Sequence, residues 1–173
     1  QYDYIYHEHL FYFSLCSMSN LLGLHGLSIY DIGRSPISGG SWVVYFSKEF
    51  KEKTARLRNA EMKEKNYGLN SLKNWLAFSQ KVKSHRESLR KIIRNSETKI
   101  FAYGASARSS TLLNYCGIDQ RYIAAIIDRN PLKHGLISPG SGIPVISYDE
   151  GSEQVKTQDN ILLLAWNFRE EII

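Results

Sequence analysis

The chain has 173 residues, 43% of them hydrophobic, and carries a formal net charge of +5 at pH 7. This length and apolar content suffice for one packed domain, or for one domain with part of another. No run approaches the ~20 apolar residues of a membrane span, and the first residues carry acids rather than a basic signal region, so we expect no membrane partner.

Titratable side chains gather at the start of the chain. Tyr6-His7-Glu8-His9 places two imidazoles, which titrate near neutral pH, on either side of a carboxylate. Such a cluster is typical of acid–base catalysis, although a hydrogen-bonded polar junction would show the same spacing. These residues are therefore our first candidates for chemistry.

A helix and a hairpin are expected next. Apolar side chains recur at helical spacing from residue 14 to Gly26, and Ser14 or Ser17 would begin this helix. The apolar runs 27–32 and 42–46 are separated by a turn rich in Gly and Ser, which predicts an antiparallel pair of strands.

Residues 48–97 have a helical pattern, with a break near Tyr67-Gly68. Most of the positive charge lies in this segment, as scattered Lys and Arg. Single-strand binders interleave aromatic side chains with basic ones, and this segment does not. A solvated helical face is favoured over a nucleic-acid patch, so we expect no nucleic-acid partner.

Strands and helices alternate from residue 98 onward, with a continuous apolar run at 123–127 that is typical of a parallel strand. The predicted fold class is α/β, a Rossmann-like and mainly parallel sheet with flanking helices, preceded by a helix and an antiparallel hairpin. The other expected strands are 99–103, 145–146 and 161–164, and the expected helices are 106–115, a weak one before residue 161, and one from about residue 167.

The turn after the first of these strands is the second candidate site. Amides at the start of the following helix, hydroxyls and a guanidinium would together cradle a phosphate, while a plain capped turn explains the same residues equally well. With a single glycine, the turn matches neither a dinucleotide fingerprint nor a P-loop. Asp128, about twenty-four residues after Gly104, stands where such folds bind a ribose hydroxyl. The candidate substrate-binding residues are Gly104, Ser106, Arg108, Ser109, Ser110, Asp128 and Asn167.

The cysteines predict no metal site within this chain. Cys16 and Cys116 lie a hundred residues apart and form no CxxC pair, which argues against a disulfide framework or a structural zinc site. We expect reduced, buried cysteines and a cytoplasmic location.

Six segments carry a resemblance to a known family. Taken together and in their order along the chain, these segments resemble the C-terminal part of the S-adenosylmethionine-dependent sugar C-methyltransferases, which act on nucleotide-linked keto-deoxysugars. The segments are 6–14, Gly39-Gly40-Ser41, 103–119, 128–135, 138–145 and 162–173.

The resemblance implies a three-part enzyme with an N-terminal zinc-binding domain, a central S-adenosylmethionine-binding domain and a C-terminal Rossmann-like domain. Residues 1–47 would then be the last segment of the methyltransferase domain. Residues 48–97 would form a helical connector, and residues 98–173 would form the Rossmann-like domain that binds the nucleotide sugar. Because the chain begins with Gln1, we expect a fragment. By resemblance, the zinc ligands and most contacts to the methyl donor lie elsewhere in the parent protein, so we expect the fragment to be inactive alone.

The implied chemistry assigns roles to the first cluster. A sugar carbon becomes nucleophilic when a base removes a proton next to the ketone and the enolate is stabilised. By resemblance His9 is the base, Glu8 and Tyr6 position the sugar or stabilise charge, and His7 packs or hydrogen-bonds structurally. The sequence departs from the common family form at Ser38, often His, and at Arg108-Ser109-Ser110, often Lys-Gly-Asn, which bears on substrate details.

Two other functions fit parts of the sequence. An NAD(P)-dependent oxidoreductase would use the same turn, but needs further glycines and a separate catalytic set. A non-catalytic nucleotide-sugar-binding or assembly module would need only residues 98–173, and the presence of Tyr6-His7-Glu8-His9 argues against it. The sequence leaves the sugar, the nucleotide, the methylated carbon and the oligomeric state open.

Overall fold

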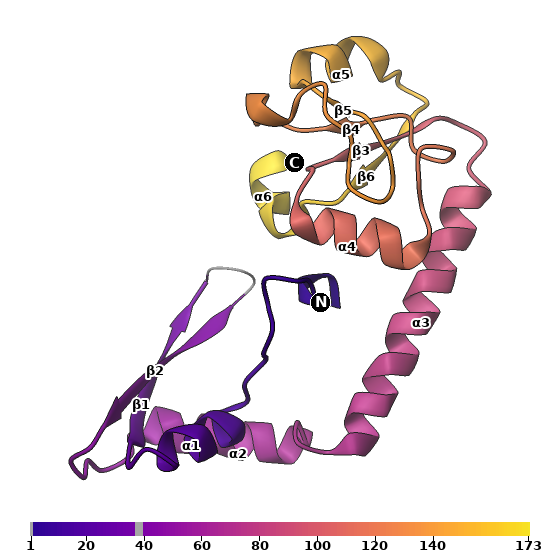
Figure 1. Ribbon diagram of the computed structural model, residues 1–173. Coiled ribbons are helices and arrows are strands. Elements are labelled where there is room, and N and C mark those ends of the chain that lie inside the picture. Colours follow the sequence, from indigo (N-terminus) through magenta and orange to yellow (C-terminus); the bar gives the residue numbers. More distant parts are fainter. Residues whose placement is uncertain (1, 37–39) are drawn as a thin grey trace. The chain divides into compact units, whose positions relative to one another are not determined.

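The computed structural model describes residues 2–36 and 40–173, which form two compact units (Figure 1). The hairpin unit comprises Phe11–Gln80, and the Rossmann-like unit comprises Lys81–Ile173 together with the N-terminal residues up to Leu10. The three-part division at residues 47 and 97 concerns roles in a larger enzyme, and it stays a prediction.

The hairpin unit begins with α1 (Leu15–Gly23), which starts after Ser14 as the sequence allowed. Ser14 and Ser17 form a reciprocal capping box that satisfies the first free amides of the helix. The helix ends three residues before Gly26, because the chain turns there: the Gly26 amide donates to the Gly23 carbonyl, and Gly26 has a φ of +68°.

The predicted hairpin is confirmed. Strands β1 (Ser28–Ser35) and β2 (Ser41–Ser47) pair antiparallel, with Ile32 opposite Val44. Helix α2 (Ala55–Tyr67) follows, and Gly68 ends it in the left-handed region at the predicted break. The buried core of this unit lies between α1, β1 and α2 and consists of Leu15, Ile29, Ile32, Leu57 and Ala60.

Helix α3 (Leu72–Arg94) crosses the boundary between the units and leads into a parallel sheet of order β5-β4-β3-β6. The predicted α/β class and mainly parallel sheet are therefore confirmed. The strands are β3 (Ile100–Tyr103), β4 (Ile126–Ile127), β5 (Val145–Ile146) and β6 (Asn160–Leu163). Strand β4 is shorter than the predicted 123–127, because only its last two residues pair with both neighbouring strands.

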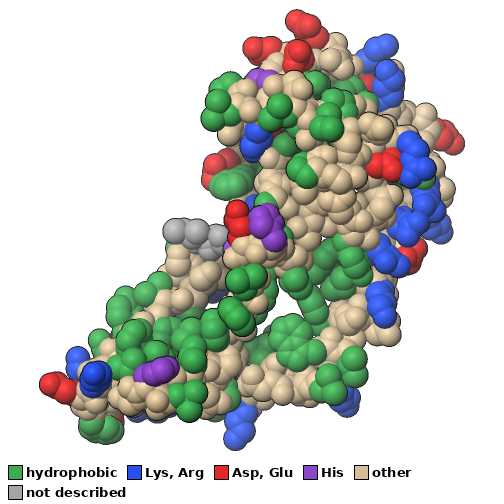
Figure 2. Space-filling view, viewed as in Figure 1, with side chains coloured by type: hydrophobic (Ala, Val, Ile, Leu, Met, Phe, Trp, Pro, Cys, Tyr) green, Lys and Arg blue, Asp and Glu red, His purple; other side chains and the backbone are tan. Residues whose placement is uncertain are grey.

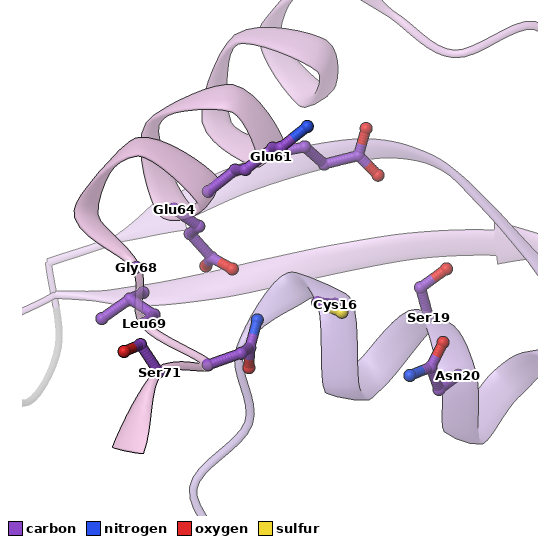
Figure 3. Close-up of a pocket in the computed structure, with 10 residues that line it drawn as sticks. Cys16, Ser19, Asn20, Glu61, Glu64, Gly68, Leu69 and Ser71 are labelled. Carbon is purple, nitrogen blue, oxygen red and sulfur yellow. The ribbon is translucent and has the colours of Figure 1, made fainter. Parts of the chain in front are cut away.

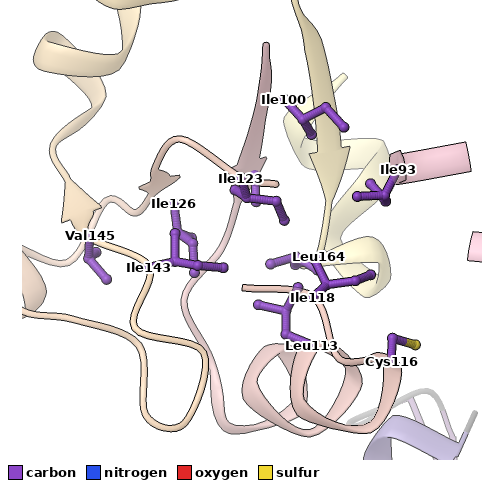
Figure 4. Close-up of a cluster of buried hydrophobic side chains, with 11 residues drawn as sticks. Ile93, Ile100, Leu113, Cys116, Ile118, Ile123, Ile126, Ile143, Val145 and Leu164 are labelled. Carbon is purple, nitrogen blue, oxygen red and sulfur yellow. The ribbon is translucent and has the colours of Figure 1, made fainter. Parts of the chain in front are cut away.

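Both faces of the sheet are buried at its central strands β3 and β4, as is typical of a parallel sheet. Ile100, Ala102 and Ile126 face a core that α4 (Ala107–Cys116) covers with Leu113 and Cys116 (Figure 4). Alternate residues, including Phe101 and Ile127, face the other side, where Gly151 of α5 (Tyr148–Gln154) packs against Ile127. Figure 1 shows α4 and α5 on opposite sides of the sheet.

Strand β3 is the point where the chain changes direction across the sheet. From β3 the chain passes through α4 to β4 and β5, then returns to β6 on the other side of β3. The described residues also form the short helices η1 (Tyr2–Tyr4), η3 (Pro131–Lys133), η4 (Trp166–Phe168) and α6 (Arg169–Ile172). In such folds, ligands bind beyond the carboxyl ends of the strands near this reversal.

The two cysteines differ in exposure. Cys116 is buried as expected, and burial raises the pKa of its thiol. Cys16 is exposed, which corrects the expectation, because the inner face of α1 carries Leu15, Met18 and Leu22 at a spacing that excludes position 16. Both thiols are free of disulfides.

Candidate functional site

A cavity of about 580 Å³ lies beside the start of α4 in the Rossmann-like unit. Segments far apart in the sequence line it. The N-terminal segment contributes Tyr6 and His7, the first turns of α4 contribute Ser106 and Ser110, and η3 contributes Lys133. The cavity therefore brings part of the first candidate cluster beside the second.

Ser106 and Ser109 build the start of α4. The Ser106 hydroxyl accepts from the Ser109 amide at 3.2 Å, and the Ser106 amide donates to the Ser109 hydroxyl at 3.2 Å. The buried Ser109 hydroxyl also donates to the Gly104 carbonyl at 2.6 Å. These contacts correspond to the capped turn that was one of the two open interpretations, while Ser106 still lines the cavity.

Asp128 fastens this turn to the loop after β4. One carboxylate oxygen accepts from the Ala105 amide at 2.7 Å and from Lys133 Nζ at 3.2 Å. The other accepts from the Asn130 amide at 2.9 Å, and Lys133 Nζ also donates to the Ala105 carbonyl at 2.6 Å. A ribose contact of Asp128 stays a prediction, since both of its oxygens bind protein groups here.

Arg108 points away from the cavity into a cluster of aromatic side chains. Its Nη1 donates to the Tyr4 hydroxyl at 2.7 Å, and its Nη2 donates to Asn167 Oδ1. The guanidinium carbon lies 4.7 Å from the centre of the Tyr4 ring and 5.8 Å from that of Trp166. Substrate contacts of Arg108 and Asn167 stay predictions, and the two residues contact each other.

His9 is oriented by the backbone of the same N-terminal segment. Its Nδ1 lies 2.9 Å from the Tyr4 carbonyl oxygen, and its ring centre lies 4.3 Å from that of Tyr6. A carbonyl only accepts hydrogen bonds, so Nδ1 carries the proton and the basic lone pair of the neutral ring is on Nε2. This is the form that a general base needs.

His7 and Glu8 are exposed. The His7 side chain is 84% accessible and its Nε2 lies 4.0 Å from Glu8 Oε1. The His7 side chain faces the cavity and solvent, and its ring meets that of Tyr6 edge-on with centres 6.0 Å apart. The expectation that His7 packs or hydrogen-bonds structurally stays a prediction. A catalytic or positioning role of Glu8 stays a prediction.

Sequence reasoning missed Asp3, Tyr4 and the indole of Trp166. Trp166 Nε1 donates to the buried Asp3 carboxylate at 2.9 Å. The Tyr2 hydroxyl approaches His85 Nδ1 at 3.0 Å, and burial raises the pKa of Tyr2 well above its usual value. No local spacing signals these contacts, since each joins η1 to a segment more than eighty positions away.

The hairpin unit has a separate cavity of about 500 Å³ between α1 and the end of α2 (Figure 3). Glu61 and Glu64 from α2 face Cys16, Ser19 and Asn20 from α1. The cavity contains none of the predicted site residues. Gly39 of the Gly39-Gly40-Ser41 segment lies outside the described residues, and so does Ser38, where the sequence departs from the common family form.

Over residues 2–36 and 40–173, no cluster of three or more His, Cys, Asp or Glu side chains could hold a metal ion. In those same residues, no helix combines the length and apolar character needed to cross a membrane.

Comparison with known proteins gives two matches. Residues 36–173 match the family described as "C-methyltransferase C-terminal domain". The whole chain is 36% identical, over 178 aligned residues, to a protein of Streptomyces niveus named C-methyltransferase NovU. The chain spans 42% of the length of that relative.

Proposed function

This chain belongs to the C-methyltransferase family, and from that premise we propose that it forms the substrate-side part of an enzyme that methylates a carbon next to the ketone of a nucleotide-linked deoxysugar. The observation that carries this proposal is the hydrogen bond from His9 Nδ1 to the Tyr4 carbonyl, which leaves the basic lone pair on Nε2.

Carbon methylation at such a position requires removal of a proton. A carbon beside a ketone becomes nucleophilic when a base takes that proton and the charge moves onto the ketone oxygen. His9 Nε2 is the proposed base. The Tyr6 ring packs against that of His9 at 4.3 Å, and Tyr6 with Glu8 is proposed to orient the sugar or to stabilise the enolate charge.

S-adenosylmethionine supplies the electrophilic methyl group when it is bound, and the family relationship implies it as the donor. The turn after β3 does not fit this group, because Ala165 occupies the space beside its single glycine, Gly104. No donor contact is therefore assigned to this turn, and the donor is proposed to bind residues outside this chain.

The nucleotide is proposed to bind in the cavity beside α4. Ser106 and Ser110 offer hydroxyl groups, and Lys133 adds a positive charge that suits a diphosphate. The cavity includes Tyr6, so a sugar attached to the diphosphate would lie near the catalytic segment.

The hairpin unit is proposed to close a methyltransferase domain, as the resemblance implies. Four large apolar side chains of β2, namely Trp42, Val43, Tyr45 and Phe46, are between 42% and 49% exposed. Figure 2 shows hydrophobic side chains gathered over this part of the hairpin unit. A two-stranded sheet with such side chains is marginal alone, which supports packing against a further domain.

The direct test is methylation by the full-length protein. With S-adenosylmethionine and a thymidine-diphosphate keto-deoxysugar, we expect a product heavier by one CH₂, with the new methyl group on the carbon next to the ketone. Magnetic resonance of the product locates that group. Methylation on oxygen, or nucleotide-sugar binding without any transfer, would contradict the proposal and favour an O-methyltransferase or a non-catalytic binding module.

A further inference from the structure

The N-terminal segment that carries His9 is fastened to the Rossmann-like unit through η1. Tyr2 contacts His85, Asp3 accepts from the Trp166 indole, and Tyr4 accepts from Arg108. Asp3 is 7% exposed and Tyr4 is 9% exposed, so this short helix is held as part of the core. The position of His9 thus depends on contacts with α4 and η4.

Arg108 is the central residue of this attachment. Its guanidinium packs over the rings of Tyr4 and Trp166 and hydrogen-bonds Tyr4 on one side and Asn167 on the other. A planar guanidinium can stack on rings and donate in fixed directions at the same time, which an ammonium cannot do. These contacts join α4, η4 and η1 at one residue.

Tyr4 connects this attachment to the candidate base. Its hydroxyl accepts from Arg108, and its carbonyl oxygen accepts from His9 Nδ1 at 2.9 Å. The Tyr4 and His9 rings are nearly parallel, at 9°, with centres 6.3 Å apart. A displacement of Tyr4 would therefore move the acceptor that determines which ring nitrogen of His9 is protonated.

We propose that Arg108 is a positioning residue for His9: together with Asn167 it holds Tyr4, and the Tyr4 carbonyl in turn keeps His9 in its Nδ1–H form. This inference rests on the proposed function, in which His9 is the base. It assigns Arg108 a role different from the phosphate contact predicted from sequence, because Arg108 does not line the cavity beside α4.

The first test is magnetic resonance of the His9 imidazole in the full-length protein, with ¹⁵N-labelled histidine. In the wild-type protein the nitrogen shifts should correspond to the Nδ1–H form. In Arg108→Ala the shifts of both nitrogens should move toward the average of a mixture of the two neutral forms. Arg121→Ala is the matched control, because Arg121 also hydrogen-bonds and stacks on a ring, but with Asp119 and Tyr122.

The second test is kinetic. Arg108→Ala should lower kcat by up to about 10²-fold, the effect of a misplaced catalytic group, while KM for the nucleotide sugar stays within about twofold. Arg108→Lys should recover little of this loss, because lysine cannot hold Tyr4 and Asn167 in the same geometry. Asn167→Ala removes one acceptor and no ring contact, so it should change the same two readouts less and keep the fold.

The outcomes separate this inference from the proposed function. Unchanged His9 shifts in both Arg108→Ala and Asn167→Ala would overturn the positioning role. A raised KM with unchanged kcat, restored by Arg108→Lys, would instead make Arg108 a phosphate ligand. Failure of wild-type methylation would contradict the proposed function alone, because the nitrogen shifts are measured without any reaction.

Discussion

Gly104, at the end of β3, lies against Ala165, which follows β6, so closely that a β-carbon at Gly104 would be 2.6 Å from the Ala165 Cβ. Gly104 also has a φ of +97°, a conformation that other residues rarely adopt. The contact joins the two segments that follow neighbouring parallel strands. It sets the position from which α4 and its cavity-lining hydroxyls begin.

We predict that Gly104→Ala destabilises the Rossmann-like unit. The positive φ costs about 1–2 kcal/mol for a residue with a β-carbon, and the clash with Ala165 adds about 1–3 kcal/mol. Gly117→Ala is the control, because Gly117 has a φ of +61° and open space around it. The difference between the two variants in the free energy of unfolding, measured in urea, gives the cost of the clash. An equal loss of unfolding free energy in both variants would show that Ala165 moves aside at no cost.

A second prediction concerns the nucleotide. Lys133→Ala should weaken binding of a thymidine-diphosphate sugar to the full-length protein by roughly 1.5–3 kcal/mol, the contribution of a charge-assisted hydrogen bond. The loss should shrink at high salt, since exposed charges are screened beyond about 8–10 Å. Calorimetric titration measures this loss of binding free energy, and Arg108→Ala is titrated in parallel. Weaker binding in Arg108→Ala but not in Lys133→Ala would place the phosphate at Arg108, as predicted from sequence.

A third prediction is a pH dependence of the hairpin unit. Arg56 Nε donates to Asp31 Oδ1 at 2.5 Å and Thr54 donates to the same oxygen at 2.6 Å, and these contacts hold the pKa of Asp31 well below its usual value. The stability that Asp31 contributes is therefore complete above its unfolded pKa of about 4 and is lost as the pH falls below it.

Asp31→Asn should accordingly lower the denaturation midpoint of the hairpin unit at pH 7 and have a smaller effect at pH 2. Glu49→Gln, at an exposed carboxylate of the same unit, is the control. Intrinsic fluorescence followed through urea unfolding at both pH values measures the difference. An effect of Asp31→Asn that is the same at both pH values would contradict the assignment to this ionised carboxylate.

Hydrophobic periodicity predicted most elements of the fold. Short apolar runs placed β3, β5 and β6 within a residue or two, because buried parallel strands are continuously apolar. The start of α2 was missed: the pattern was extended back to residue 48, whereas the helix begins after its cap at Thr54. Residues 123–125 are apolar, with Ile123 and Ala125 buried and Ala124 exposed, but they lie outside the ladder that defines β4.

The candidate site was predictable only where its contacts are local. The capping of α4 depends on Ser106 and Ser109, three positions apart, and the sequence therefore indicated it. The contact between Tyr4 and Arg108 joins positions 104 apart, and no spacing rule encodes such a pair. For the same reason, the exposure of His7 beside the cavity could not be inferred from its tetrapeptide.

The role of His9 also predicts a kinetic result. In the full-length protein, His9→Gln should lower turnover by about 10²–10⁴-fold, the usual contribution of a general acid–base group. Methyl-donor affinity should change little, since His9 acts on the sugar. His25→Gln is the matched control, because His25 is exposed at the end of α1 in the other unit. A selective loss of donor affinity would place His9 in the donor site instead.

Proton removal by His9 is measured most directly in the absence of the methyl donor. The full-length protein is incubated with the nucleotide keto-sugar in D₂O, and deuterium at the carbon beside the ketone is followed by magnetic resonance. We expect exchange at that carbon with the wild-type protein and His25→Gln, and exchange slower by at least about 10²-fold with His9→Gln. Exchange by His9→Gln at the wild-type rate would contradict His9 as the base.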